Sequence, residues 1–175
     1  MTKLLLIPVL FVAACLFAGV YGALHNQISY TVCPEYFTEY KFHQFRIDDR
    51  LPDRVGAAIV GWKAAWWMGI VIGILLIPVG LVMRGTGPYF WGMIRVFGVV
   101  TITTMCVGLG ALAVSYVTTS ADVGNFTRYG NEITNDVAFA HAGAMHNCSY
   151  LGGLMGIISG GCAINVQRRR QREAT

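Results

Sequence analysis

The chain has 175 residues, of which 55% are hydrophobic and only 13% are charged, and its formal net charge is +4. Soluble globular domains carry about 25% charged residues, so this composition argues against a soluble domain and for a membrane protein. The basic residues flank apolar runs. We therefore interpret the positive charge as a topology signal and predict no nucleic-acid partner.

Four stretches with at most one charged residue each are long enough to cross a bilayer, which takes about 20 apolar residues. In hydrocarbon every backbone polar group must pair internally, so unbroken apolar runs of this length predict helices rather than strands. We predict an all-α membrane protein, with one integral membrane domain over residues 1–175. Its four transmembrane helices are predicted near 4–24, 58–83, 92–118 and 142–165.

The first apolar stretch has two interpretations. Gly22 fits the end of a cleavable signal peptide, and the four residues that end at Cys15 resemble a lipoprotein box. However, the apolar run continues to Leu24, which suits a membrane span better than a short signal core. We predict a retained helix and keep a cleaved signal peptide as the alternative.

The orientation follows from the basic residues. With four spans both termini share a side, and that side carries a single acid, Glu173, against seven basic residues. The positive-inside rule then places both termini and the tail 166–175 in the cytoplasm, supported by the short 84–91 connection. The predicted outer loops are 25–57 and 119–141. The seven basic residues are Lys3, Arg84, Arg95, Arg168, Arg169, Arg170 and Arg172.

Small residues recur every four positions in two of the predicted helices. Helices in lipid associate through close backbone approach, which glycine permits. This spacing predicts tight helix packing, against a neighbour in this chain or in another subunit. The residues concerned are Gly69 and Gly73 in the second helix and Gly152, Gly156 and Gly160 in the fourth.

The segment HAGAMHNC opens the fourth helix and holds His141, Met145, His146 and Cys148. Histidine, methionine and cysteine side chains together suit soft metal ions, copper(I) above all. A haem would instead need a second histidine on another helix, and His25 is the candidate because it is predicted at a similar depth in the membrane. At 100° per residue, however, His146 lies on a different helix face from the other three. The alternatives are a polar helix end that bonds to loops and headgroups, and a quinone or lipid pocket.

Two cysteines, Cys33 and Cys148, lie on the predicted outer side. An oxidising compartment would permit a disulfide between them, which would tie the first outer loop to the fourth helix. The remaining cysteines lie within apolar segments and are interpreted as small packing residues.

Six aromatic residues crowd the first outer loop. Pro34 suits the first turn of a short helix over residues 34–45. The aromatic residues then form either a docking face for another protein or a lid over this bundle. They are Tyr30, Tyr36, Phe37, Tyr40, Phe42 and Phe45.

Residues 25–31 (HNQISYT) and 34–38 (PEYFT), with the run 146–153, resemble segments of an uncharacterised family of small bacterial four-helix membrane proteins. The resemblance implies a protein of the bacterial inner membrane and draws attention to the outer ends of helices one and four. The chain departs from the family pattern at Asn26 and Cys33, where an acid and a small hydroxyl residue are expected.

Function is predicted as a non-catalytic accessory or structural subunit, whose partners are the lipid bilayer and other membrane protein subunits. The first alternative is a metal- or haem-binding protein with its site at the outer ends of helices one and four. The second is a small transporter or channel, for which Lys63 near the interface is thin support. The sequence contains no nucleotide-binding loop or nucleophile–base pair, so we expect no enzyme, and no cofactor is specified.

Overall fold

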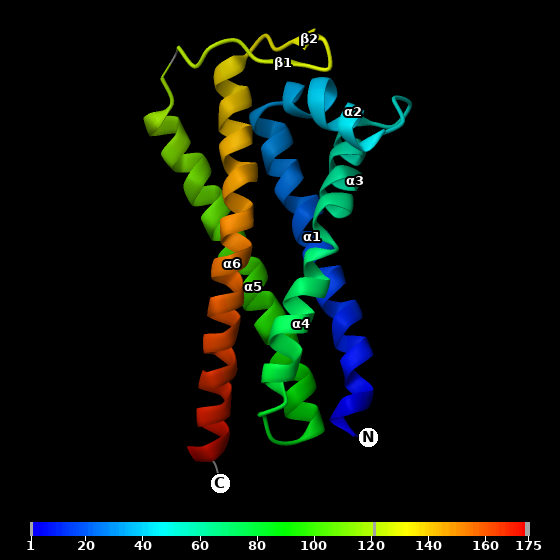
Figure 1. Cartoon of the computed structure of the whole chain (residues 1–175), viewed down its shortest axis with the longest axis vertical. Coiled ribbons are helices and arrows are strands. Elements are labelled where there is room, and N and C mark those ends of the chain that lie inside the picture. The colour runs from blue at the N-terminus through cyan, green and yellow to red at the C-terminus, as the bar shows by residue number, and fades with distance from the viewer. Residues whose placement is uncertain (1, 121, 174–175) are drawn as a thin grey trace.

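Long helices make up most of the chain in the computed structural model, which describes residues 2–120 and 122–173 (Figure 1). The fold is all-α apart from one two-stranded hairpin. The elements in chain order are η1 (Lys3–Leu6), α1 (Ile7–Val32), η2 (Tyr36–Lys41), α2 (Phe42–Phe45), α3 (Asp53–Ala65), α4 (Met68–Gly80), α5 (Thr86–Thr118), β1 (Thr127–Arg128), β2 (Asn131–Glu132) and α6 (Asp136–Glu173).

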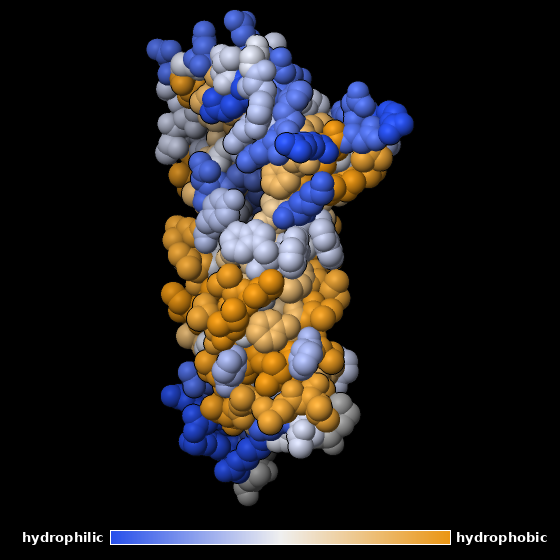
Figure 2. All heavy atoms as spheres, turned by 45° about the vertical axis from the view of Figure 1, so that its right-hand side comes forward, coloured by the Kyte–Doolittle hydropathy of each residue, from blue (hydrophilic) through white to orange (hydrophobic). Residues whose placement is uncertain are grey.

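Three helical segments are long and apolar enough to cross a membrane: Lys3–Val32, Thr86–Thr118 and Asp136–Glu173. The helices α3 and α4 pass the same test together, but they are bent by 44° at a short break, so the described residues hold three to four candidate spans. The face shown in Figure 2 carries an apolar band between two hydrophilic ends. The prediction of a helical, multi-pass membrane protein is confirmed at this level.

The second predicted helix, 58–83, is wrong as a single rod because it is two helices, α3 and α4. The amides of Gly69 and Ile70 bond to the carbonyls of Trp66 and Trp67, both at 3.0 Å. These bonds span three residues instead of four, so the backbone tightens there and the axis turns. No proline marks the break, and the apolar run continues through it.

The first helix extends well beyond the predicted end at residue 24, to Val32, so the predicted loop 25–57 begins too early. Nothing in this stretch stops a helix before Pro34. A proline disfavours helical backbone in the residue before it, and Cys33 is extended, with φ −148° and ψ 99°. The short helical segment predicted over 34–45 is present as η2 and α2.

The third helix ends at Thr118 as predicted, but its start and both ends of the fourth helix lie outside the predicted bounds. Instead of beginning at residue 92, α5 begins at Thr86, since Pro88 falls in its first turn, where proline is tolerated. Similarly, α6 replaces the predicted 142–165 and takes in much of the tail 166–175, of which residues 174 and 175 lie outside the described part.

The helices associate as two groups. Within the bundle α5 packs mainly against α6, while α1 packs against α3 and α4. In Figure 1 α1 begins and α6 ends at the same end of the molecule, and the β1–β2 hairpin lies at the other end, which we call the outer end. One apolar core fills the inner half of the bundle around Met93 and Phe97.

A second core closes the outer end, where η2 and α2 lie against α3 and the start of α6. It is built around Phe37 and Phe139. Polar contacts join η2 and the residue before it to residues 122–135. The Glu35 carboxylate accepts bonds from the Thr134 hydroxyl and the Asn135 amide, and Glu39 accepts one from Asn131 at 2.8 Å. We call η2, α2 and residues 122–135 together the outer cap.

Candidate functional site

The glycines predicted to pack lie at contacts between helices of this chain. A Cβ atom on Gly152 would lie 3.0 Å from the Thr104 carbonyl oxygen of α5, and one on Gly156 would meet Val100 at the same distance. Gly160 faces Val100 and Leu76. The neighbour of the α6 glycine stripe is therefore α5, with α4 beside it.

The two glycines of α4 lie against α1. A Cβ atom on Gly69 would come within 2.4 Å of the Cys15 backbone, and one on Gly73 would come within 2.6 Å of the Phe11 ring. The closest crossing was not predicted: a Cβ on Gly22 would lie 2.2 Å from the Gly61 carbonyl oxygen.

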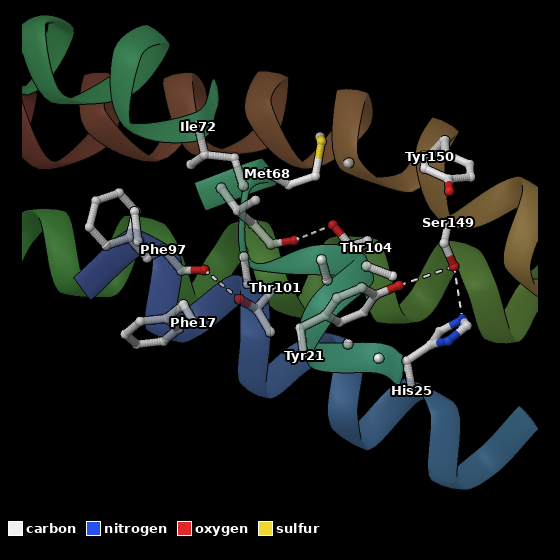
Figure 3. A pocket seen from close by; sticks show the side chains of 18 of the residues that line it. Phe17, Tyr21, His25, Met68, Ile72, Phe97, Thr101, Thr104, Ser149 and Tyr150 are labelled. Atoms are coloured by element: carbon white, nitrogen blue, oxygen red, sulfur yellow. Dashed lines mark hydrogen bonds between the residues drawn. The ribbon is translucent and has the colours of Figure 1, made fainter. Parts of the chain in front are cut away.

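A cavity of about 100 Å³ lies where the two helix groups meet. Its wall follows α1 from Ala14 to Asn26, about 18 Å at 1.5 Å per residue. Most of this wall is apolar. Phe17 and Phe97 stand at its inner part, and Met68 and Gly153 line it from α4 and α6 (Figure 3).

Five polar side chains gather at the outer end of the cavity, and we call them the polar cluster. Tyr21 donates its hydroxyl to Ser149 at 3.1 Å, and the same Ser149 oxygen lies 2.8 Å from His25 Nε2. These three side chains point toward one another in Figure 3. Asn26 donates its amide to the Ala57 carbonyl at 3.0 Å, and its side-chain oxygen lies 3.4 Å from His25 Nδ1. His146 is the fifth member.

His146 connects the polar cluster to the outer cap. Its ring stacks on Tyr36, with centroids 4.9 Å apart and planes at 26°, and it meets His25 edge-on, also at 4.9 Å. Phe37 lies 6.0 Å away. His146 Nε2 is buried and has no hydrogen-bond partner.

The residues predicted as metal ligands are divided between two places. His25 and His146 meet at the cavity, whereas His141 bonds to Ser115 of α5 at 3.0 Å and packs on Tyr116. Met145 is fully buried. Within residues 2–120 and 122–173, no group of three or more His, Cys, Asp or Glu side chains is placed to hold a metal ion.

Cys33 and Cys148 are both free thiols, and the disulfide between them stays a prediction. Burial raises the pKa of the Cys33 thiol. Since the thiolate is the reactive form, Cys33 is poorly placed to react.

The aromatic residues of the first outer loop differ in exposure. Tyr36 and Phe37 are buried in the core of the outer cap. Tyr30, Tyr40, Phe42 and Phe45 are half-buried around that core. Burial raises the pKa of the Tyr36 hydroxyl, and it lowers the pKa of Lys41, whose ammonium lies 4.3 Å from the centre of the Tyr40 ring.

No protein-family model matches the chain, and neither a curated protein nor a solved structure matches it. The bacterial four-helix family suggested by residues 25–38 and 146–153 therefore stays a resemblance. The cavity and its polar end are the features of the chain that bear on function.

Sequence reasoning selected His25 and His146 but missed Tyr21, Asn26 and Ser149. A signal was present, because Tyr21, His25 and Ser29 are spaced four apart and therefore share one face of α1. Polar side chains on one face of an apolar helix point into the bundle, where they find partners. Which residue of α6 meets them depends on how the helices cross.

Proposed function

We propose that this chain is a non-catalytic, four-span integral membrane protein that binds a lipophilic molecule inside its bundle. One observation carries the proposal: an elongated apolar cavity between five helices ends at a cluster of polar side chains. Ligand sites commonly combine apolar walls with a few convergent polar groups. The apolar wall suits a chain or ring system, and the polar cluster suits its headgroup.

The proposal includes four spans, with α3 and α4 as one broken span, both termini in the cytoplasm and a location in the bacterial inner membrane. The end at which α1 begins and α6 ends carries the Arg-rich run 168–172, which favours the cytoplasmic side. Membrane-impermeant thiol labelling of single-cysteine variants tests this orientation. In intact cells Ser120→Cys is expected to react and Glu173→Cys to stay unlabelled until the membrane is opened. The opposite pattern would reverse the orientation.

We expect Gly153→Leu to fill part of the cavity and abolish ligand binding. A Cβ atom at Gly153 meets only Met68 Cε, at 3.5 Å, which is ordinary contact, so the helix accepts the change while the larger side chain occupies the cavity. The measurement is binding of neutral membrane lipids to the purified protein in detergent, followed by the rise in melting temperature. We expect the rise to disappear.

Gly161→Leu is the matched control, because it makes the same change on the same helix where nothing lies within 4 Å of the new Cβ. It is expected to bind as the unaltered protein does. Lipid binding that survives Gly153→Leu would rule the cavity out as the site.

The accessory-subunit hypothesis stays a prediction and is compatible with this proposal, since a bundle that holds a lipophilic molecule can serve a larger membrane assembly. The metal- or haem-binding alternative has less support. The His25 and His146 rings are in direct contact at 4.9 Å, which leaves no room for a haem between them, and the described residues place no group of three or more His, Cys, Asp or Glu side chains for a metal ion. The transporter alternative stays a prediction. Lys63, which motivated it, is exposed, bonds to the Phe45 carbonyl of α2 and does not line the cavity.

A further inference from the structure

We propose that His146 Nε2 is the hydrogen-bond partner of the ligand, and that the ligand is an uncharged lipid whose headgroup carries a carbonyl or hydroxyl oxygen. Prenylated quinones and prenols share this chemistry. The inference rests on the proposed function and names the class of molecule that the cavity binds.

The hydrogen bonds of the polar cluster leave one buried atom, on a residue that lines the cavity, without a partner. The other four members bond to one another or to the backbone: His25 and Tyr21 to Ser149, and Asn26 to Ala57. His146 also lines the cavity, yet its buried Nε2 has no partner among the described residues. A buried polar atom of this kind is costly, and a ligand oxygen that reaches it removes the cost.

The His146 ring is held in one orientation. Tyr36 covers one face at 4.9 Å, and the His25 ring stands against it at 82°. A side chain fixed in this way does not need to be ordered when the ligand binds, which favours affinity.

The charge of the lining selects an uncharged headgroup. No Lys, Arg, Asp or Glu is among the described residues that line the cavity. A phosphate or carboxylate headgroup would require a cationic partner, and an ammonium headgroup would require a carboxylate. Anionic phospholipids are therefore poor candidates.

The polar groups deeper in the cavity already have hydrogen-bond partners within the protein. Thr101 and Thr104 donate their hydroxyl groups to the carbonyls of Phe97 and Val100 in their own helix, at 2.9 Å and 2.8 Å. Hydroxyl groups bonded in this way leave the inner part of the cavity effectively apolar. The headgroup therefore belongs at His146, and the hydrocarbon tail belongs beside Phe17.

The test is His146→Phe, which keeps a ring to stack on Tyr36 and removes the polar atom. The probes are a ubiquinone with two isoprene units, geranylgeraniol and phosphatidylglycerol, titrated into the protein in detergent. We expect both neutral probes to bind and phosphatidylglycerol to bind far more weakly. His146→Phe is expected to lose about tenfold in affinity for a neutral probe, the value of one hydrogen bond to a buried group.

A purely structural role for His146 predicts a different result. Because the substitution removes an unpartnered polar atom, the melting temperature of the ligand-free protein should not fall, whereas a structural role would lower it. His146→Gln, which keeps a side-chain donor, should retain most of the affinity even where the ring is lost. His43→Phe, on the exposed part of the outer cap, is the control and should bind normally.

The outcomes separate the two proposals. Neutral probes that bind the unaltered protein, fail with Gly153→Leu and bind His146→Phe undiminished would overturn the role of His146 and leave the cavity as the site. Tightest binding of phosphatidylglycerol would overturn the uncharged headgroup. A ubiquinone that binds while the prenol does not identifies the carbonyl as the recognised group, and the reverse identifies the hydroxyl. No binding of any lipid would overturn the proposed function itself.

Discussion

Gly61→Leu is expected to lower the free energy of unfolding by about 3 kcal/mol or more, because it separates two helices that touch through their backbones. A Cβ atom on Gly61 would lie 2.1 Å from the carbonyl oxygen of Gly22. Backbone cannot turn away as a flexible side chain can, so α1 and α3 must move apart. The measurement is thermal unfolding of the purified protein in detergent, followed by circular dichroism.

Gly98→Leu on α5 is the matched control, since nothing lies within 4 Å of the Cβ that it adds. It is expected to change stability by less than about 0.5 kcal/mol, as surface substitutions usually do. Equal stability of Gly61→Leu and Gly98→Leu would show that α1 and α3 do not cross at Gly22.

The Gly22–Gly61 crossing also positions the polar cluster. His25 and Asn26 lie about one helical turn beyond Gly22 on α1. Asn26 reaches the Ala57 carbonyl of α3 only because the two helices approach closely at the crossing. Gly61→Leu should therefore weaken ligand binding together with stability.

The membrane segments were predictable from the sequence because hydrocarbon imposes a strong and simple constraint on composition and length. The helix ends were not, because a helix does not stop where the membrane stops. α1 continues to Val32, until Pro34 disfavours helical backbone at Cys33. The break at Trp66 and Trp67 lies within apolar residues, so hydropathy gave no sign of it.

The candidate site was half predictable. The helical wheel correctly separated His146 from His141, since one meets His25 and the other meets Ser115. It could not show that Ser149 reaches His25, because that contact depends on how α1 and α6 lie relative to each other. The His146 ring stacks on Tyr36, and Tyr36 belongs to the outer cap. The fold of this cap depends on tertiary packing, so the contact could not be predicted from the sequence.

Phe37→Ala is expected to open the outer cap. The Phe37 side chain is fully buried, at 0% exposure, and it contacts Tyr30, Tyr36 and Phe42. Truncating a buried phenylalanine costs about 3–5 kcal/mol, and this core shares no residue with the apolar core of the inner half, so the loss should fall on the cap. The measurement is the rate of protease cleavage within residues 46–52, which should rise strongly.

Tyr129→Ala is the control, because the Tyr129 side chain belongs to the same cap but is 62% exposed. It should leave the cleavage rate nearly unchanged. This pair distinguishes the two interpretations of the aromatic loop. If the aromatic loop is a lid, Phe37→Ala alone should make the chain sensitive to protease. If it is a docking face, either substitution should weaken binding of a partner protein and leave the resistance to protease unchanged.

The same substitution should affect the cavity from a distance. Phe37 packs against Tyr36, and Tyr36 covers one face of the His146 ring. When the cap opens, His146 becomes free to turn and to bond with water, so it no longer requires a ligand oxygen. Phe37→Ala should therefore weaken binding of a neutral lipid although Phe37 does not line the cavity, and unchanged affinity would separate the cap from the site.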